Sequence, residues 1–173
     1  MVFTQKQNLL LKRLNSTLLF KAVSIAKLPL AFITGLKIDE CNGNECVTSV
    51  RMKYLNKNPF GSTYFAVLSM AAELSTGALA LTAVEGINPS VALILTNMNA
   101  DFIKKAHGRT TFTCTDGEKL FSAVNNAVDT KDPHVQTRRG VGSGSTFCKN
   151  IQNVGLRFQS NPSRHVLCKR GTD

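Results

Sequence analysis

Apolar residues recur at helical spacing near the start of the chain, over residues 6–27. Leu10, Leu14 and Leu18 lie on one face of a helix with this spacing. Lysines and an arginine interrupt the stretch, so it holds no span of about 20 uncharged residues that could cross a membrane. Pro29 follows the predicted end of the helix. We therefore expect a cytoplasmic protein with an amphipathic N-terminal helix that packs one face on the domain.

A second group of segments has the composition of strands, separated by turn residues. The predicted strands are residues 31–40, 46–54, 89–99 and 109–115. Between the first two lies Asn42-Gly43-Asn44, and Asn-Gly favours the positive φ angles of a tight hairpin turn. Apolar residues at helical spacing predict another helix over residues 117–129.

The most apolar segment lies between these strands, at residues 64–83, and its only charged residue is Glu73. We expect Ser62 or Thr63 to cap a helix here. The charge near its middle, together with its Ser and Thr residues, argues against a membrane span. A helix this apolar in a soluble protein must be covered on nearly all sides. A curved sheet folded around one central helix satisfies that requirement.

Regular patterns end near residue 134, where the charge balance also changes. Residues 1–133 carry 14 Lys and Arg against 10 Asp and Glu, whereas residues 134–173 carry 7 against 1. Residues 154–158 are a candidate strand, and two further strands are needed after residue 134 to complete a sheet. We therefore divide the chain into a domain at residues 1–133 and a basic C-terminal segment at 134–173, whose structure the sequence leaves open.

Glu73 is the first candidate for chemistry. An ionised carboxylate inside an apolar helix is costly unless it is paired or hydrogen-bonded, and a raised pKa would suit a general base. The alternative is a glutamate on the one helix face that meets a lysine or solvent.

The start of the same helix is the second candidate. The segment from Asn58 to Phe65 leads into the helix, and a helix N-terminus presents free N–H groups with a partial positive charge behind them. Such donors can stabilise a thioester oxygen as it gains negative charge. The alternative is an ordinary capped turn.

The stretch from Asn58 to Glu73 resembles the central-helix motif of the hotdog thioesterases, in particular a bacterial thioesterase-like branch of that superfamily. The motif has an Asn, a His-Gly-Gly six residues later, and an acidic residue nine positions after the His. Asn58 and Glu73 match the first and last of these positions. Tyr64 stands at the His position, and Phe65-Ala66 replaces the two glycines.

This resemblance implies an α+β hotdog fold, in which an antiparallel sheet wraps around the long central helix, with an extra N-terminal helix. It also implies a homodimer or tetramer with sites at the dimer interface. In that site Glu73 would act as base or nucleophile and the Phe65 N–H would polarise the carbonyl. Asn58 would position the reacting groups, and the Tyr64 hydroxyl could donate a hydrogen bond.

The basic segment of residues 104–109 is the last candidate. The resemblance implies that Lys104, Lys105 and Arg109 meet the phosphates of a CoA moiety, and the alternative is a solvated basic turn. The three histidines have no metal-ligand spacing, so we expect no metal and no cofactor other than the CoA of the substrate.

Taken together, these features predict hydrolysis of an acyl-thioester, with acyl-CoA as the expected substrate. The main alternative is a hotdog protein that binds acyl-CoA or a fatty-acyl group without catalysis, because the His and the glycines of the motif are replaced. Nucleic-acid binding ranks last, since only Phe147 and Phe158 place aromatic rings in the basic C-terminal segment.

Overall fold

The computed structural model describes residues 2–87, 91–95, 100–102, 104–130, 139–143, 148–149, 151–152 and 154–158. Its helices are α1 (Gln5–Asn15), α2 (Thr17–Lys27), α3 (Pro29–Thr34), the 3-10 turn η1 (Tyr54–Asn56), α4 (Phe65–Val84) and α5 (Gly117–Thr130). Its strands are β1 (Lys37–Cys41), β2 (Cys46–Arg51), β3 (Val91–Leu95), β4 (Asp101–Phe102), β5 (Arg109–Cys114), β6 (Arg139–Ser143), β7 (Cys148–Lys149), β8 (Ile151–Gln152) and β9 (Val154–Phe158).

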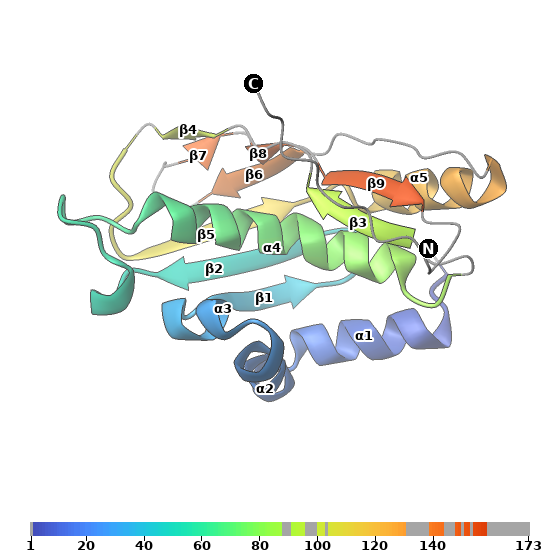
Figure 1. Cartoon of the computed structure of the whole chain (residues 1–173), viewed down its shortest axis with the longest axis horizontal. Helices are drawn as coiled ribbons and strands as arrows, with labels where there is room; N and C mark the ends of the chain where they lie inside the picture. The colour runs from blue at the N-terminus through green and yellow to red at the C-terminus, as the bar shows by residue number, and fades with distance from the viewer. Residues whose placement is uncertain are drawn as a thin grey trace, which may run out of the picture.

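The strands in the described part of the chain pair antiparallel throughout and curve around one helix. One sheet has the order β1-β2-β5-β6-β8, and the pairs β3-β9 and β4-β7 form two further two-stranded sheets. Figure 1 shows α4 lying along the five-stranded sheet, with β1, β2 and β5 on one side of the helix and β3 and β9 on another. This arrangement is the α+β hotdog architecture that the sequence predicts, and β9 confirms the candidate strand at residues 154–158.

The hairpin between β1 and β2 forms at the predicted turn. Gly43 has a φ angle of 89°, which favours glycine. The Asn42 side chain closes the turn, because its Oδ1 accepts hydrogen bonds from the N–H groups of Asn44 and Glu45. The strands then pair from Cys41 opposite Cys46 to Lys37 opposite Ser49.

Helix α4 packs its N-terminal half on the middle of the sheet. Leu68, Ala71 and Ala72 are buried against Val50 of β2 and Phe112 of β5. The Thr48 hydroxyl donates a 2.6 Å hydrogen bond to the Ala71 carbonyl, which joins β2 directly to the helix. These contacts fix the height and rotation of α4 over the strands.

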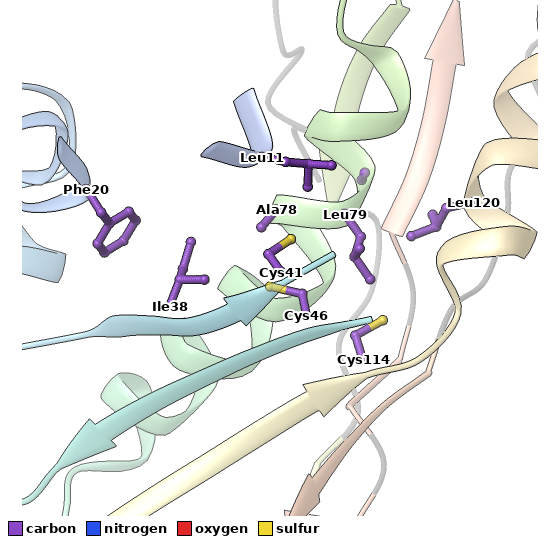
Figure 2. Packing of buried hydrophobic residues seen from close by; sticks show 10 residues of the cluster. Leu11, Phe20, Ile38, Cys41, Cys46, Ala78, Leu79, Cys114 and Leu120 are labelled. Carbon is purple, nitrogen blue, oxygen red and sulfur yellow. The ribbon is translucent and has the colours of Figure 1, made fainter. Parts of the chain in front are cut away.

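The C-terminal half of α4 packs on a second cluster that contains three thiols. Cys41, Cys46 and Cys114 lie on three neighbouring strands and are buried under Leu79, as Figure 2 shows. The hydrogen bond to Cys41 and the burial of the side chain raise the pKa of the Cys46 thiol above its usual value. These thiols therefore serve as small core side chains.

One prediction about α4 is wrong: the helix is not covered on nearly all sides. Glu73 and Leu81 are exposed, and Ser69, Met70 and Gly77 are half-buried. The helix is long and apolar enough to cross a membrane, but 61% of its most apolar window is buried inside the protein, as in a core helix. The uncovered residues form a strip along the helix that the described part of the chain leaves open.

The N-terminal prediction is also wrong in two respects. Residues 6–27 form two helices, because Ser16 has an extended backbone (ψ 110°) and caps α2 through its hydroxyl. Residues 29–34 form α3 rather than the start of a strand, since Pro29 suits the first position of a helix and Gly35, with φ 75°, ends it. Asn15 then ties α1 to the edge of the sheet, where its side chain donates to the Cys41 carbonyl and accepts from the Cys41 N–H.

Candidate functional site

The start of α4 is held by a loop that uses its own side chains as hydrogen-bond partners. Asn58 Oδ1 accepts from the N–H groups of Phe60 and Ser62, at 3.0 and 3.1 Å, and Asn58 Nδ2 donates to Ser62 Oγ at 2.9 Å. Gly61, with φ 73°, completes the turn. Asn58 therefore holds the shape of the loop that leads into the helix. An effect of Asn58 on the reacting groups would pass through this loop.

A second asparagine anchors this loop to the rest of the domain. Asn56 is buried, and its Nδ2 donates to the carbonyls of Thr34 and Arg51, each at 3.0 Å. The backbone carbonyl of Asn56 accepts a hydrogen bond from the Tyr64 N–H at 2.8 Å. Asn56 therefore connects the end of α3 to the residue that begins α4. Nothing local in the sequence pointed to this residue, because a lone polar residue in a loop carries no signal of such a role.

The capping prediction is wrong, and the correction bears on the site. Tyr64, not Ser62 or Thr63, is the N-cap of α4, and no side chain caps the helix. The Ser62 hydroxyl donates a hydrogen bond to the Asn58 side-chain oxygen, and the Thr63 hydroxyl donates one to the Ala106 carbonyl. Within the part of the chain that the structure describes, the N–H groups of Phe65 and Ala66 consequently have no acceptor.

Aromatic rings gather at the same end of α4. The Phe65 ring lies between Tyr64, at a centroid distance of 5.2 Å, and Phe102 of β4, at 6.2 Å with edge-to-face geometry. All three rings are about half exposed. The start of α4 therefore combines two amide donors with an apolar surface.

The basic segment that the sequence singles out divides between two places. Lys105 reaches the loop, where its Nζ donates to the Phe60 carbonyl at 3.1 Å, and the neighbouring Lys104 is exposed. Arg109 lies on β5, where its guanidinium contacts Asp39 at 2.7 Å and Ser49 at 3.2 Å. The structure thus brings Lys105 to the loop that precedes α4 and puts Arg109 on the sheet.

Glu73 lies on the exposed strip of α4, so in the single chain it matches the alternative given above, a glutamate on the helix face that meets solvent. It follows Phe65 by eight residues on the helix, which separates their Cα atoms by about 12 Å along the axis. One chain therefore does not bring the Glu73 carboxylate to its own free N–H groups.

Comparison with known proteins agrees with this architecture. The family described as "Domain of unknown function (DUF4442)" matches residues 16–144. No curated protein sequence matches the chain.

Solved structures with the same fold include several bacterial proteins. A Pseudomonas aeruginosa protein of unknown function, described as a probable thioesterase, superposes with a TM-score of 0.68 at 20% identity, over 82% of this chain and 95% of that chain. A thioesterase from Haemophilus influenzae gives 0.60 at 12% identity, over 95% and 97%. A Chlorobaculum tepidum protein of unknown function gives 0.66 at 17% identity, over 88% and 98%. The chain therefore belongs to the DUF4442 family and has the hotdog fold that these thioesterase-like structures share.

Proposed function

We propose that this protein hydrolyses an acyl-thioester, with acyl-CoA as the substrate class. The observation that carries the proposal is the pair of open N–H groups at Phe65 and Ala66, which lie at the positive end of α4 beside an apolar aromatic surface. Donors arranged in this way stabilise the oxyanion that forms when a carbonyl is attacked. The thioesterase descriptions of two structural relatives point to the same reaction.

The proposed site combines residues from two copies of the chain. A carbonyl oxygen must lie within about 3 Å of its donors, and the attacking atom within about 3–3.5 Å of the carbonyl carbon. Glu73 of the same chain lies about 12 Å along the helix from Phe65, which is too far. In the proposal, Glu73 of a second copy therefore faces the open N–H groups, with the exposed strip of α4 in the interface.

In this reaction Glu73 takes a proton from water while the water oxygen attacks the thioester carbon. The C–S bond then breaks, and the leaving thiolate takes up the proton. Direct attack by the carboxylate is the second form of the mechanism: the new C–O bond makes a mixed anhydride as the C–S bond breaks and the thiolate leaves. Water then hydrolyses the anhydride to the acid and the free Glu73 carboxylate, and the thiolate takes up the proton that this step releases. In the proposal the Tyr64 hydroxyl hydrogen-bonds the substrate, and Asn58 maintains the loop. Lys104 and Lys105 bind the CoA phosphates in the same proposal.

The second candidate function is binding of an acyl-thioester without hydrolysis. The observation that favours it is the aromatic contact of Phe65 with Tyr64 and Phe102 at the very position where the motif has small residues. These rings bind an acyl chain well but narrow the approach to the N–H groups. Measured turnover separates the two functions.

The first test measures release of free thiol from a panel of short, medium and long acyl-CoAs. We expect the parent protein to release thiol and Glu73→Gln to lose activity by orders of magnitude, because the change removes the base and keeps the size. Glu85→Gln, at the other end of α4, is the matched control and should keep activity. Full activity of Glu73→Gln would overturn the mechanism, and binding without release would favour the second function.

A second test examines the oxyanion donor. Phe65→Pro removes the N–H at the first position of α4, where proline is tolerated, and Tyr64 already has the extended backbone (φ −61°, ψ 134°) that a following proline prefers. Phe65→Ala is the control, because it removes the ring and keeps the N–H. We expect Phe65→Pro to be much less active than Phe65→Ala.

Mixing the two inactive chains tests the two-copy site. A mixed dimer of Glu73→Gln with Phe65→Pro holds one intact site if each site takes Glu73 from one copy and the N–H from the other. If both groups came from the same chain, every site would carry a defect. Recovery of activity on mixing therefore supports the shared site, and its absence from a confirmed mixed dimer contradicts it.

A further inference from the structure

Helices α2 and α3 expose an unusually apolar surface. In α2 only Phe20 and Ser24 are buried, and in α3 only Ala31 and Thr34. The exposed large side chains of this helical pair include Leu18, Leu19, Ile25, Leu30, Phe32 and Ile33. Isolated exposed apolar residues are normal, but a continuous group of them marks a surface that binds something.

The charges around this surface have one sign. The first acidic residue of the sequence is Asp39, so the described residues 2–38 carry no negative side chain. The cations in this range are Lys6, Lys12, Arg13, Lys21, Lys27 and Lys37. An apolar surface with only positive charges complements a partner that is both apolar and anionic.

A cationic pocket adjoins the helical pair. It has a volume of about 280 Å³ and is lined by Gly35, Lys37, Ser49, Arg51, Lys53 and Arg109. Gly35 leaves space for the Lys53 side chain at the edge of this pocket, since a Cβ at that position would lie 2.6 Å from Lys53 Nζ. A neighbouring pocket of about 310 Å³ shares Gly35, Lys37 and Lys53 and continues to Phe32 and Lys21 on the helices. The cationic pocket is therefore continuous with the apolar surface.

The arrangement of cations in the pocket is unfavourable without an anion. Arg51 of β2 lies directly opposite Arg109 of β5, and like charges in that position destabilise a pair of strands. Asp39 contacts Arg109 and offsets one of the charges. An anionic group bound in the pocket would offset the others.

We propose that α2 and α3 dock on an anionic lipid surface, with their apolar side chains at the headgroup boundary and a lipid phosphate in the pocket of Lys37, Arg51, Lys53 and Arg109. Apolar residues interspersed with lysines are the composition of helices that lie in a bilayer interface. A lipid surface also accounts for apolar residues on several sides of α2, because it requires no groove of fixed shape. This inference does not depend on the proposed function.

The test measures binding of the full chain to vesicles by sedimentation. We expect binding to vesicles of phosphatidylcholine mixed with phosphatidylglycerol, weak binding to phosphatidylcholine alone, and weaker binding at high salt. Lys21→Glu should lower the partition coefficient at least roughly fivefold, the effect of losing one cation near an anionic surface. Leu18→Ser with Ile25→Ser, and Lys37→Gln with Lys53→Gln, should each lower it further. Val2→Ser, at an exposed apolar residue beside α5, and Lys119→Glu, on α5, are the controls and should change it little.

Three results would overturn the proposal. Equal binding to both kinds of vesicle would remove the role of charge, and unchanged binding by both double variants would remove the assigned surface. Failure to bind any vesicle, combined with saturable binding of glycerol 3-phosphate that Lys37→Gln with Lys53→Gln abolishes, would make the pocket a site for a free phosphate compound. Failure to bind vesicles, with a loss of self-association in Leu18→Ser with Ile25→Ser, would make the surface an interface between copies.

Discussion

Helices α2 and α4 are both rich in leucine and alanine, but the fold treats them in opposite ways. Along α4 one face is buried against the sheet from Val67 to Ala83, while α2 buries little beyond Phe20 and Ser24. The two differ in charge, because α2 carries Lys21 and Lys27 whereas α4 carries only Glu73. Burying an unpaired ammonium group is costly, so the helix with the two lysines stays outside. Apolar composition therefore allows a helix to be buried in the core, and its few charged residues decide whether it is buried.

The same comparison applies within α4. Its uncharged faces contact the strands, and Glu73 marks the strip that remains open. An open strip on a core helix is a natural place for a second copy of the chain, which is the arrangement that the proposed site requires.

The largest expected effect comes from the buried face of α4. Leu79 is fully buried against the cysteine cluster, so Leu79→Ala should lower the free energy of unfolding by about 2–5 kcal/mol, through lost apolar burial and the cavity left behind. Leu55→Ala on η1, at a leucine that is 70% exposed, is the matched control and should cost less than about 1 kcal/mol. Urea denaturation measures both, and equal effects would contradict the described packing.

The connection between α3 and α4 should come next in size. Asn56→Ala leaves the buried carbonyls of Thr34 and Arg51 without their donor, and we expect a loss of about 2–3 kcal/mol. Asn125→Ala on the exposed face of α5 is the control. If Asn56→Ala matched this control in a urea denaturation curve, the anchoring role of Asn56 would be wrong.

The attachment of α1 to the sheet should matter less, because Asn15 is partly exposed to water. Asn15→Ala removes both hydrogen bonds to the Cys41 backbone and should cost about 1–2 kcal/mol. Hydrogen exchange is the sharper measurement, since the Cys41 amide should exchange faster in the variant while the Val50 amide stays protected. Unchanged exchange at Cys41 would show that water replaces the asparagine without loss.

The smallest effect is expected on the outer face of α2. Leu18 is 79% exposed, so Leu18→Ala should change the free energy of unfolding by no more than about 0.5 kcal/mol. A loss comparable to that of Leu79→Ala, measured under the same conditions, would mean that this surface is covered in solution. The oligomeric state of the parent and the variant would then identify a covering copy.

Several local elements could be predicted because their signals are local. The apolar run predicted α4 to within one residue at each end, and Asn-Gly predicted the turn between β1 and β2. The break at Ser16 was missed because the leucine spacing continues across it, although serine is a strong N-cap. Helix α3 was missed because a short and mostly apolar segment suits a strand equally well, and the Pro29 and Gly35 at its ends were the available signal.

The candidate site could be predicted only in part, because its geometry depends on contacts between distant segments. The motif pointed to the start of α4, but nothing local showed that Asn58 and Ala106 would occupy the Ser62 and Thr63 hydroxyls and leave the helix uncapped. The apolar sequence around Glu73 likewise suggested burial, and only the position of the sheet shows which side of the helix stays open.

By itself, the sequence determined the secondary structure around the long apolar helix and the residues eligible for chemistry, since capping, turn geometry and apolar periodicity act over a few residues. Only the tertiary structure decided which apolar helix is buried, which side of α4 faces outward, and that Lys105 meets the loop at Phe60 while Arg109 does not. The physical reason is that burial and long-range hydrogen bonds depend on which surfaces meet, and the chain brings those surfaces together only when the sheet closes around α4.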